Sequence, residues 1–332
     1  MNTIGTHLCM LVAAATMVLT SHLAWAFQRR VFQARQLGQY KLDVPIGEGG
    51  HGQVWRAYHA GLNASVAVKV LKGEWRLDSP QVQRFQREAR ATFALKHPNT
   101  VRMLDYGVTV DGVCYLAMEL LEGLTLAQLV AREGPLDQAW ALHVVLQAAN
   151  ALAEAHALGI VHRDVKPENL LLTQVGDDPL FCKLVDFGIA RVNDDFAPSL
   201  TGTGKVVGTP GYIAPEALSG AAADPRADVY ALGAVLHFAL TGDAPRVAGF
   251  DSAATHAGTA WIADPAIARD LKSVLARCLS PVPARRFANA SELAAHLRAC
   301  SDLQPRLSPA TAVSKTELAV QANSLPTHTL AE

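Results

Sequence analysis

The sequence lacks the features that mark several large classes of protein. Its five cysteines are widely separated and form no C-x-x-C pair, which argues against a disulfide framework or a zinc site and fits a reducing cytosolic compartment. The 29 basic and 30 acidic residues nearly cancel, so nothing predicts a nucleic-acid-binding surface. No internal repeat is apparent. With 332 residues, 50% of them hydrophobic, the chain can bury a sizeable core in one large or two modest domains.

The first 28 residues contain no Asp, Glu, Lys or Arg. Within them the 20-residue run 8–27 is long enough, at about 1.5 Å per residue, to cross roughly 30 Å of hydrocarbon. The run predicts a transmembrane anchor over residues 1–28. Two alternatives stay open: a cleaved signal peptide, because Ala24-Trp25-Ala26 is typical of a cleavage site, and a buried apolar helix.

Arginines follow this run, and no Lys or Arg precedes it. Arg29, Arg30 and Arg35 lie in residues 29–39, which we interpret as a basic juxtamembrane linker. The positive-inside rule then predicts a single-pass protein of the inner membrane with the rest of the chain in the cytosol; a wholly cytoplasmic protein is the alternative.

The first third of the remaining chain alternates between apolar and polar residues. The stretch 40–59 predicts two short strands around a Gly-rich turn, and residues 64–72 predict a third. Residues 79–97 have helical character, with Ser79-Pro80 as a start signal. Residues 100–121 predict two more strands around the turn dipeptide Asp111-Gly112. A small β-rich lobe with one helix is expected.

Helical spacing of apolar residues dominates after Gly123. It recurs in five segments, "TLAQLVAREG", "LDQAWALHVVLQAANALAEAHALG", "RADVYALGAVLHFALTG", "PAIARDLKSVLARCLS" and "SELAAHLRAC". Residues 301–332 are rich in Ser, Thr and Pro with little periodicity, which predicts a flexible tail.

The stretch "VHRDVKPENLLL", residues 161–172, sets many polar side chains among apolar ones. Desolvating so many polar groups is unfavourable unless partners or a ligand satisfy them, so the stretch is a solvated loop or a site. Two of its members, Asp164 and Asn169, are oxygen donors, and Asp186 follows in "LVDFGIA". Such donors suit magnesium better than zinc, and one carboxylate is left to receive a proton.

Two other patterns could carry chemistry. "GEGGHGQV" gives G-x-G-x-x-G followed by strand rather than helix, which favours a glycine flap over a nucleotide phosphate rather than a dinucleotide-binding turn, although a plain hairpin would also fit. "VAVKV" places Lys69 in an otherwise aliphatic strand. A lone strand Lys usually faces solvent; if Lys69 faces inward it needs an anion, such as Glu88 or a phosphate.

Taken in order, these motifs resemble those of the eukaryotic-type serine/threonine protein kinases of bacteria. "GEGGHGQV" resembles the Gly-rich loop, "VAVK" the phosphate-binding strand, "HRDVKPEN" the catalytic loop, "DFG" the metal-binding motif and "GTPGYIAPE" the end of the activation segment. The resemblance implies an α+β, bilobal protein-kinase-like fold over residues 40–300, with an N-lobe at 40–119 and a C-lobe at 120–300.

The resemblance also implies roles for single residues. Asp164 would accept the proton of the substrate hydroxyl, Lys166 would neutralise γ-phosphate charge, and Lys69 would hold the α/β-phosphates with Glu88 as its partner. Asn169 and Asp186 would bind Mg²⁺ or Mn²⁺. The remaining nucleotide contacts that the family pattern implies for ATP are Ile46, Gly47, Gly49, Gly52, Val54, Ala67, Met118, Glu119, Leu121 and Leu171.

Three further expectations concern architecture and control. Glu216 and Arg286 resemble the ion pair that braces the helical lobe, and Asp228 resembles the residue that hydrogen-bonds the catalytic-loop backbone. Arg163, expected as a buried cation, resembles residues that bind a phosphate on the activation segment, where Thr201 and Thr203 are candidates for autophosphorylation.

The function implied is γ-phosphate transfer from ATP to Ser or Thr of protein substrates, with no nucleic-acid partner and an unknown oligomeric state. A pseudokinase scaffold that binds nucleotide is the main alternative. A kinase of small molecules is disfavoured, because "GTPGYIAPE" resembles a peptide-binding segment.

Overall fold

The computed structural model describes residues 36–49, 52–72, 76–187, 210–220, 222, 224–245 and 267–300. The chain divides into two compact units. The sheet unit takes its described residues from Met1–Glu74 and from Gly107–Leu120, and the helical unit takes its described residues from Trp75–Tyr106 and Leu121–Glu332. Because residues 75–106 group with the helices, the helix between the third and fourth predicted strands belongs to the helical unit. The predicted lobe boundary at 119/120 therefore stays a prediction.

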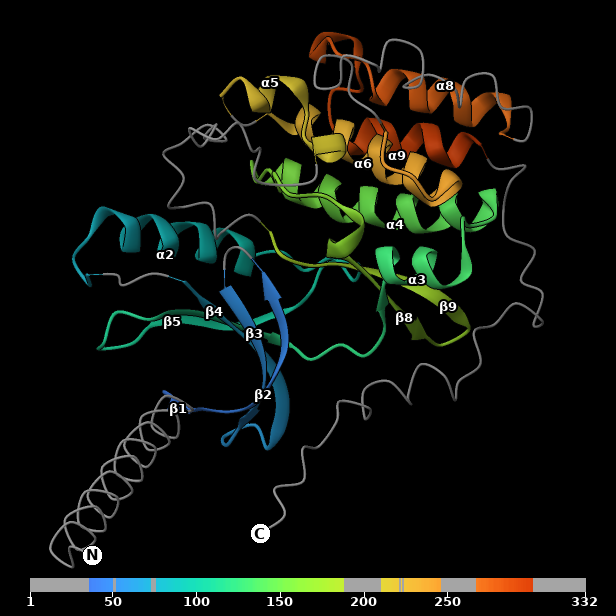
Figure 1. Ribbon diagram of the computed structural model, residues 1–332. Helices are drawn as coiled ribbons and strands as arrows, with labels where there is room; N and C mark the ends of the chain where they lie inside the picture. Colours follow the sequence, from blue (N-terminus) through green and yellow to red (C-terminus); the bar gives the residue numbers. More distant parts are fainter. Residues whose placement is uncertain are drawn as a thin grey trace, which may run out of the picture. The chain divides into compact units, whose positions relative to one another are not determined.

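The six-stranded sheet has the order β1-β2-β3-β4-β6-β5 (Figure 1). Its strands are β1 (Gln36–Leu37), β2 (Tyr40–Gly49), β3 (Gly52–His59), β4 (Ala64–Leu71), β5 (Met103–Val108) and β6 (Cys114–Glu119). The pairs from β1 to β4 and the pair β4–β6 are antiparallel. The five predicted strands are confirmed, as is the turn at Asp111-Gly112.

The central strand β4 carries the core of the sheet unit. Ala67 and Val68 are buried on both faces of the strand, with Val66 and Leu71 at its ends. This near-continuous apolar run is typical of a strand covered on both sides rather than on one. Lys69 lies in the same run and is only 8% exposed, so it does not have the usual outward orientation of a strand lysine, and the inward alternative applies.

The helical unit begins with α2 (Pro80–Phe93), which starts where the sequence predicted. The Ser79 hydroxyl accepts a hydrogen bond from the Val82 amide at 3.3 Å, and Pro80 occupies the first turn, where its missing N–H is not needed. Phe85 on the inner face of the helix is fully buried, which contributes about 1.5–3 kcal/mol.

Two sets of hydrogen bonds fix the chain segment that follows α2. The Glu154 carboxylate accepts the backbone amides of Lys96 and His97 at 2.9–3.1 Å. The Asn99 amide donates to the Gln147 side chain at 2.8 Å and to a backbone carbonyl of β9 at 2.7 Å. Since Gln147 and Glu154 both belong to α4, this helix holds the segment 96–99 in place.

The rest of the helical unit packs around one core. Its elements are β7 (Leu124–Thr125), α3 (Leu126–Glu133), α4 (Gln138–Ala157), η1 (Pro167–Asn169), β8 (Leu170–Val175), β9 (Asp178–Leu184), η3 (Pro210–Tyr212), α5 (Pro215–Leu218), α6 (Pro225–Thr241), α8 (Arg269–Cys278), η5 (Pro283–Arg285) and α9 (Ala290–Ala299). Helix α4 contacts both α6 and α9, as Figure 1 shows. The five predicted helices are confirmed, and the α+β, two-lobed class is correct.

The central helices are long and apolar, yet none could span a membrane: among the described residues no helix combines the required length and hydropathy. The predicted anchor at 1–28, residues 29–35 of the predicted linker and the predicted tail at 301–332 lie outside the described residues. Four of the five cysteines are described, and all four are buried free thiols, as expected.

One buried ion pair joins α5 to the end of η5. The Arg286 guanidinium contacts both oxygens of Glu216, at 2.6 and 2.8 Å, and its side chain is fully buried. Its remaining donors reach the carbonyls of Ser280 at 2.8 Å and Arg226 at 3.1 Å. The predicted structural pair is confirmed, and Arg286 also ties together the segment after α8, through Ser280, and the first turn of α6, through Arg226.

Replacing Arg286 with Ala should therefore lower the free energy of unfolding of the helical unit by about 3–5 kcal/mol, because Glu216 would stay part-buried without its counter-charge. Denaturant titration of the full chain measures this loss. Arg277→Ala is the matched control, since the Arg277–Glu292 pair at 2.5 Å is more than a third exposed and should contribute about 0–1 kcal/mol. Equal losses in the two variants would contradict the bracing role.

Candidate active site

Three polar side chains of the loop between α4 and β8 form one hydrogen-bonded cluster. Lys166 Nζ donates to Asp164 Oδ2 at 2.8 Å, and the Asn169 amide donates to the same oxygen at 3.1 Å and to the Asp164 carbonyl at 2.7 Å. The Asp164 side chain is 20% exposed and that of Lys166 is 32% exposed. The cluster thus presents an oriented carboxylate and an ammonium group to a ligand from outside the chain.

The backbone of this loop is held by a carboxylate from α6. Asp228 is 1% exposed and accepts the amides of His162 and Arg163, each at 2.8 Å. The prediction that Asp228 binds the catalytic-loop backbone is confirmed. His156 of α4 adds a third donor, Nε2, at 2.9 Å from the same carboxylate.

The tautomer of His156 follows from its other nitrogen. Nδ1 accepts the Ala290 amide at 3.2 Å, so the ring proton sits on Nε2 and is donated to Asp228. Sequence reasoning missed His156, whose only signal was a histidine in the last turn of an apolar helix. One neutral imidazole thereby links the start of α9 to the loop.

His162 anchors the other side of the loop. Its Nδ1 accepts the Asp164 amide at 3.3 Å and its Nε2 donates to the Val185 carbonyl at 3.0 Å. Burial lowers the pKa of His162 below its ordinary value, opposed by the charges of Asp228 and Asp164. The ring is therefore neutral near pH 7, and it packs against Phe187 with ring centroids 4.5 Å apart.

Backbone pairing brings Asp186 to the cluster. The Val185 amide donates to the Asn169 carbonyl at 2.9 Å, and β8 and β9 pair just beside it at Leu170 and Leu184. Asp186 has φ 60 and Arg163 has φ 66, a left-handed conformation that costs a non-glycine residue of order 1–3 kcal/mol. Asp186 and Arg163 adopt this unfavourable conformation on either side of the Asp164 cluster. The contacts around the cluster must therefore hold the backbone in place.

The oxygen atoms of Asn169 and Asp186 are suitable ligands for a hard divalent cation. Both N–H groups of the Asn169 amide are engaged by Asp164, and its side-chain oxygen has no hydrogen-bond partner among the described residues. That oxygen and the carboxylate of Asp186 are the ligand type that Mg²⁺ and Mn²⁺ prefer.

The sheet unit holds the other predicted phosphate contact. Lys69 lies opposite Val54 of β3 and Leu116 of β6, and Ala67, two residues earlier, lies opposite Met118. Strand side chains two residues apart share a face of the sheet, so Lys69 and Ala67 are on one face of β4. A buried ammonium on a central strand requires an anionic partner.

Packing requires glycine at one of the three predicted loop positions but not at the other two. A Cβ on Gly52 would lie 2.1 Å from the Val70 carbonyl oxygen, so packing alone requires glycine there. A Cβ on Gly47 would make only ordinary contact, and one on Gly49 would meet nothing among the described residues within 4 Å. The described fold does not explain the last two glycines, whereas close approach of a ligand to their backbone would.

The remaining predicted nucleotide contacts are distributed over both units. Met118 and Glu119 end β6 in the sheet unit, and Leu121 and Leu171 lie in the helical unit, both part-buried. Ile46 of β2 is 48% exposed, an unusual exposure for a large apolar side chain. The assignment of these residues to ATP stays a prediction.

Glu88 lies in an electropositive part of the helical unit. Burial raises the pKa of its carboxyl, while the charges of Arg163, Arg87 and Arg84 act in the opposite direction. Arg163 itself is exposed, so the expectation of a buried cation is wrong. The pairing of Glu88 with Lys69 stays a prediction, since the two residues belong to different units. Thr201 and Thr203 lie outside the described residues.

Comparison with known proteins agrees with this geometry. The protein kinase domain model matches residues 40–297. The serine/threonine-protein kinase pkn3 of Myxococcus xanthus is 38% identical over 296 residues, covering 86% of this chain and 54% of that protein. PknH of Mycobacterium bovis is 41% identical over 265 residues, covering 77% of this chain and 43% of that protein. This chain therefore spans about half the length of the curated relatives it matches.

A solved structure extends the similarity to three dimensions. The kinase domain of Mycobacterium tuberculosis PknI matches with a TM-score of 0.62 and 30% identity, covering 80% of this chain and 96% of that one. The matched family region contains the Asp164 cluster, the buried Lys69 and the Asp228 anchor. The chain belongs to the protein kinase family and is a member of its bacterial, eukaryotic-type serine/threonine branch.

Proposed function

We propose that this protein transfers the γ-phosphate of ATP to Ser or Thr hydroxyls of proteins. The observation that carries the proposal is the Asp164 cluster, in which one carboxylate is oriented by Lys166 and by both N–H groups of Asn169. A carboxylate so oriented can accept the proton of a bound hydroxyl, and a neighbouring ammonium can offset charge on the phosphoryl group.

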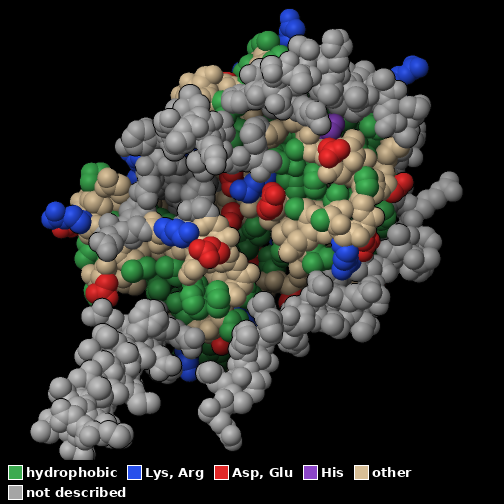
Figure 2. All heavy atoms as spheres, viewed as in Figure 1, with side chains coloured by type: hydrophobic (Ala, Val, Ile, Leu, Met, Phe, Trp, Pro, Cys, Tyr) green, Lys and Arg blue, Asp and Glu red, His purple; other side chains and the backbone are tan. Residues whose placement is uncertain are grey.

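Each other residue has a part in the proposal. Lys69 holds the α- and β-phosphates, with Glu88 placing it, and Asn169 and Asp186 hold Mg²⁺ or Mn²⁺. When bound, the metal neutralises phosphate charge. The glycines Gly47 and Gly49 let backbone amides approach the phosphates. Figure 2 shows acidic and basic side chains interspersed over the described part of the visible face.

The first test is phosphate transfer by the full chain from ATP with Mg²⁺ or Mn²⁺, to itself and to a generic protein substrate, with the phosphosites mapped. Asp164→Asn should lower the rate at least about 100-fold, because the proton acceptor is lost, while ATP binding is retained. Asp177→Asn is the matched control, as Asp177 is exposed in the β8–β9 turn.

The outcomes separate the enzyme from the scaffold. Transfer that vanishes only in Asp164→Asn supports the kinase, and phosphate on Thr201 or Thr203 supports autophosphorylation of the activation segment. Full activity in a chain with Thr201→Ala and Thr203→Ala would contradict that regulation. ATP binding without transfer would favour a pseudokinase scaffold.

The metal assignment has its own test. Asn169→Ala removes the amide oxygen and should weaken divalent-cation binding in the presence of ATP by about tenfold or more. Titration with Mn²⁺ followed by electron paramagnetic resonance measures this affinity without requiring turnover. Asp164→Asn serves as the comparison, since Asp164 is assigned to the hydroxyl rather than to the metal. Unchanged Mn²⁺ affinity in Asn169→Ala would remove Asn169 from the metal site.

Residues 1–28 are proposed to anchor the protein in the inner membrane with the kinase domain in the cytosol, where ATP is present. Leu11→Arg with Val18→Arg should release the full chain from carbonate-washed membranes, because each central Arg opposes insertion by roughly 2.5–3.5 kcal/mol. Leu318→Arg with Val320→Arg is the matched control. Mass spectrometry of the N-terminus identifies a cleaved signal peptide, and retention of the first variant would contradict the anchor.

A further inference from the structure

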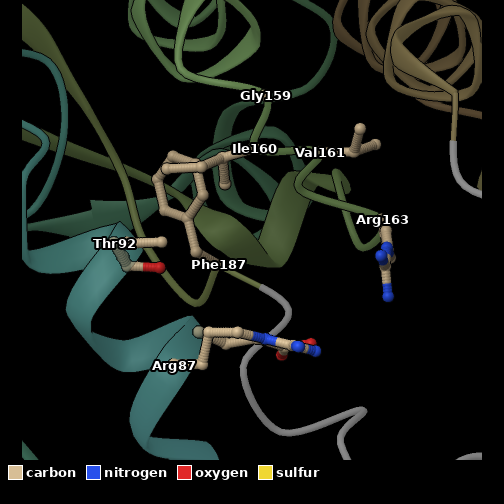
Figure 3. A pocket seen from close by; sticks show the side chains of 9 residues that line it. Arg87, Thr92, Gly159, Ile160, Val161, Arg163 and Phe187 are labelled. Atoms are coloured by element: carbon tan, nitrogen blue, oxygen red, sulfur yellow. The ribbon is translucent and has the colours of Figure 1, made fainter. Parts of the chain in front are cut away.

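A pocket of about 180 Å³ lies within the helical unit, between α2 and the loop that follows α4 (Figure 3). It is distinct from the Asp164 cluster, because none of Asp164, Lys166 or Asn169 lines it. Its inner wall is apolar, formed in part by Ile160 and Phe187. An apolar cavity of about 150 Å³ holds a benzene molecule, so the pocket is large enough for one aromatic ring.

One threonine hydroxyl faces this apolar wall. Thr92 of α2 is 6% exposed, and Figure 3 shows its methyl and hydroxyl groups pointing from the helix toward Phe187. Its hydroxyl has no hydrogen-bond partner among the described residues. The hydroxyl is therefore available to form a hydrogen bond with a polar atom of a ligand in the pocket.

Charged side chains of both signs line the same pocket, and the balance among them is positive. Arg87 and Arg163 contribute two guanidinium groups and Glu88 contributes one carboxylate. None of the three makes a salt bridge or a side-chain hydrogen bond with another residue of the described ranges. Both Arg side chains are exposed, and both act on the carboxyl of Glu88. A guanidinium fork is suited to a carboxylate or a phosphate.

From this arrangement we propose that the pocket binds a small organic anion: an aromatic carboxylate or phosphate whose ring lies against Phe187 and Ile160 and whose anionic group meets Arg87 and Arg163. A hydrogen-bonding substituent on the ring would reach Thr92. The apolar wall separates this ligand from a bare phosphate or a phosphorylated side chain, which would use the guanidinium groups and leave the wall and the Thr92 hydroxyl without contacts.

The pocket is placed to influence phosphate transfer. Helix α2 carries Glu88, and Phe187 directly follows the proposed metal ligand Asp186. A ligand in the pocket would contact both α2 and Phe187. It would thereby stabilise one arrangement of Glu88 and Asp186 over others. This effect on transfer rests on the proposed function, whereas binding of the anion does not.

Ligand-observed NMR titration of the full chain tests the binding. The protein is treated with phosphatase and saturated with ADP, so that its own phosphates and the nucleotide site do not contribute. The probes are phenyl phosphate, benzoate, 4-hydroxybenzoate, phosphothreonine and inorganic phosphate. Phenyl phosphate should bind with a dissociation constant on the order of 1 mM or tighter, as expected for a ligand of this size.

Variants assign the binding to this pocket. Thr92→Leu fills the hollow and should abolish binding of phenyl phosphate. Arg87→Gln should weaken it about tenfold or more, in line with the loss of a charge-assisted hydrogen bond. Arg90→Gln, an exposed arginine on the same helix that does not line the pocket, should leave it unchanged. Thr92→Val keeps the shape and should weaken 4-hydroxybenzoate but not benzoate, which provides a second reading if the Leu variant does not fold.

Two results would overturn the proposal. One is equal affinity for inorganic phosphate, phosphothreonine and phenyl phosphate. That result would mean that Arg87 and Arg163 bind any anion and that the apolar wall does not contribute. The other is no saturable binding of any aromatic probe up to about 20 mM, well beyond the expected range. Phosphate-transfer assays run separately on the same samples show whether a failure concerns this pocket or the kinase activity itself.

Discussion

The Asp228 carboxylate is the constraint on which the geometry of the candidate active site depends. It lies in the first turn of α6, nearly inaccessible to solvent, and receives three N–H groups, two from the loop backbone and one from His156. A buried carboxylate is tolerated when several donors satisfy it. The same bonds hold Arg163 at φ 66, a conformation that the residue would otherwise leave. The hydrogen bonds that stabilise the buried Asp228 carboxylate are therefore also the ones that fix the backbone of the catalytic loop.

A chain of hydrogen bonds connects this carboxylate to the proposed metal ligands. His162, fixed by its amide at Asp228, reaches the Val185 carbonyl through its ring, and the Val185 amide bonds to Asn169. Asp186 follows one residue later. Because each link is a hydrogen bond between part-buried or buried groups, removal of one member leaves others unsatisfied. Such a network has few alternative arrangements, as expected of a site that must hold proton acceptor and metal ligands in register.

Much of this could be predicted from the sequence, because much of it is local. Apolar periodicity gave the five strands and the five helices after Gly123, and the ordered motifs gave Asp228 and the Glu216–Arg286 pair. What the sequence pattern left open or missed depends on contacts distant in the chain. The burial of Lys69 is set by the neighbours of β4 on both sides, and the exposure of Arg163 is set by a loop bent around Asp228. His156 could not be assigned, since its tautomer is fixed by an amide 134 residues away.

The glycines show the same division between what folding requires and what a ligand requires. In the sequence Gly47, Gly49 and Gly52 look alike, and a hairpin accounts for all three. In the structure only Gly52 is pressed against a neighbouring strand, so its lack of a side chain is a packing requirement. Gly47 and Gly49 are exposed, beside an exposed Ile46. Glycine weakens a strand interior unless something approaches its backbone closely. Glycine is unfavourable at these two exposed positions unless a ligand approaches their backbone. A ligand covering the loop would also cover the exposed side chain of Ile46.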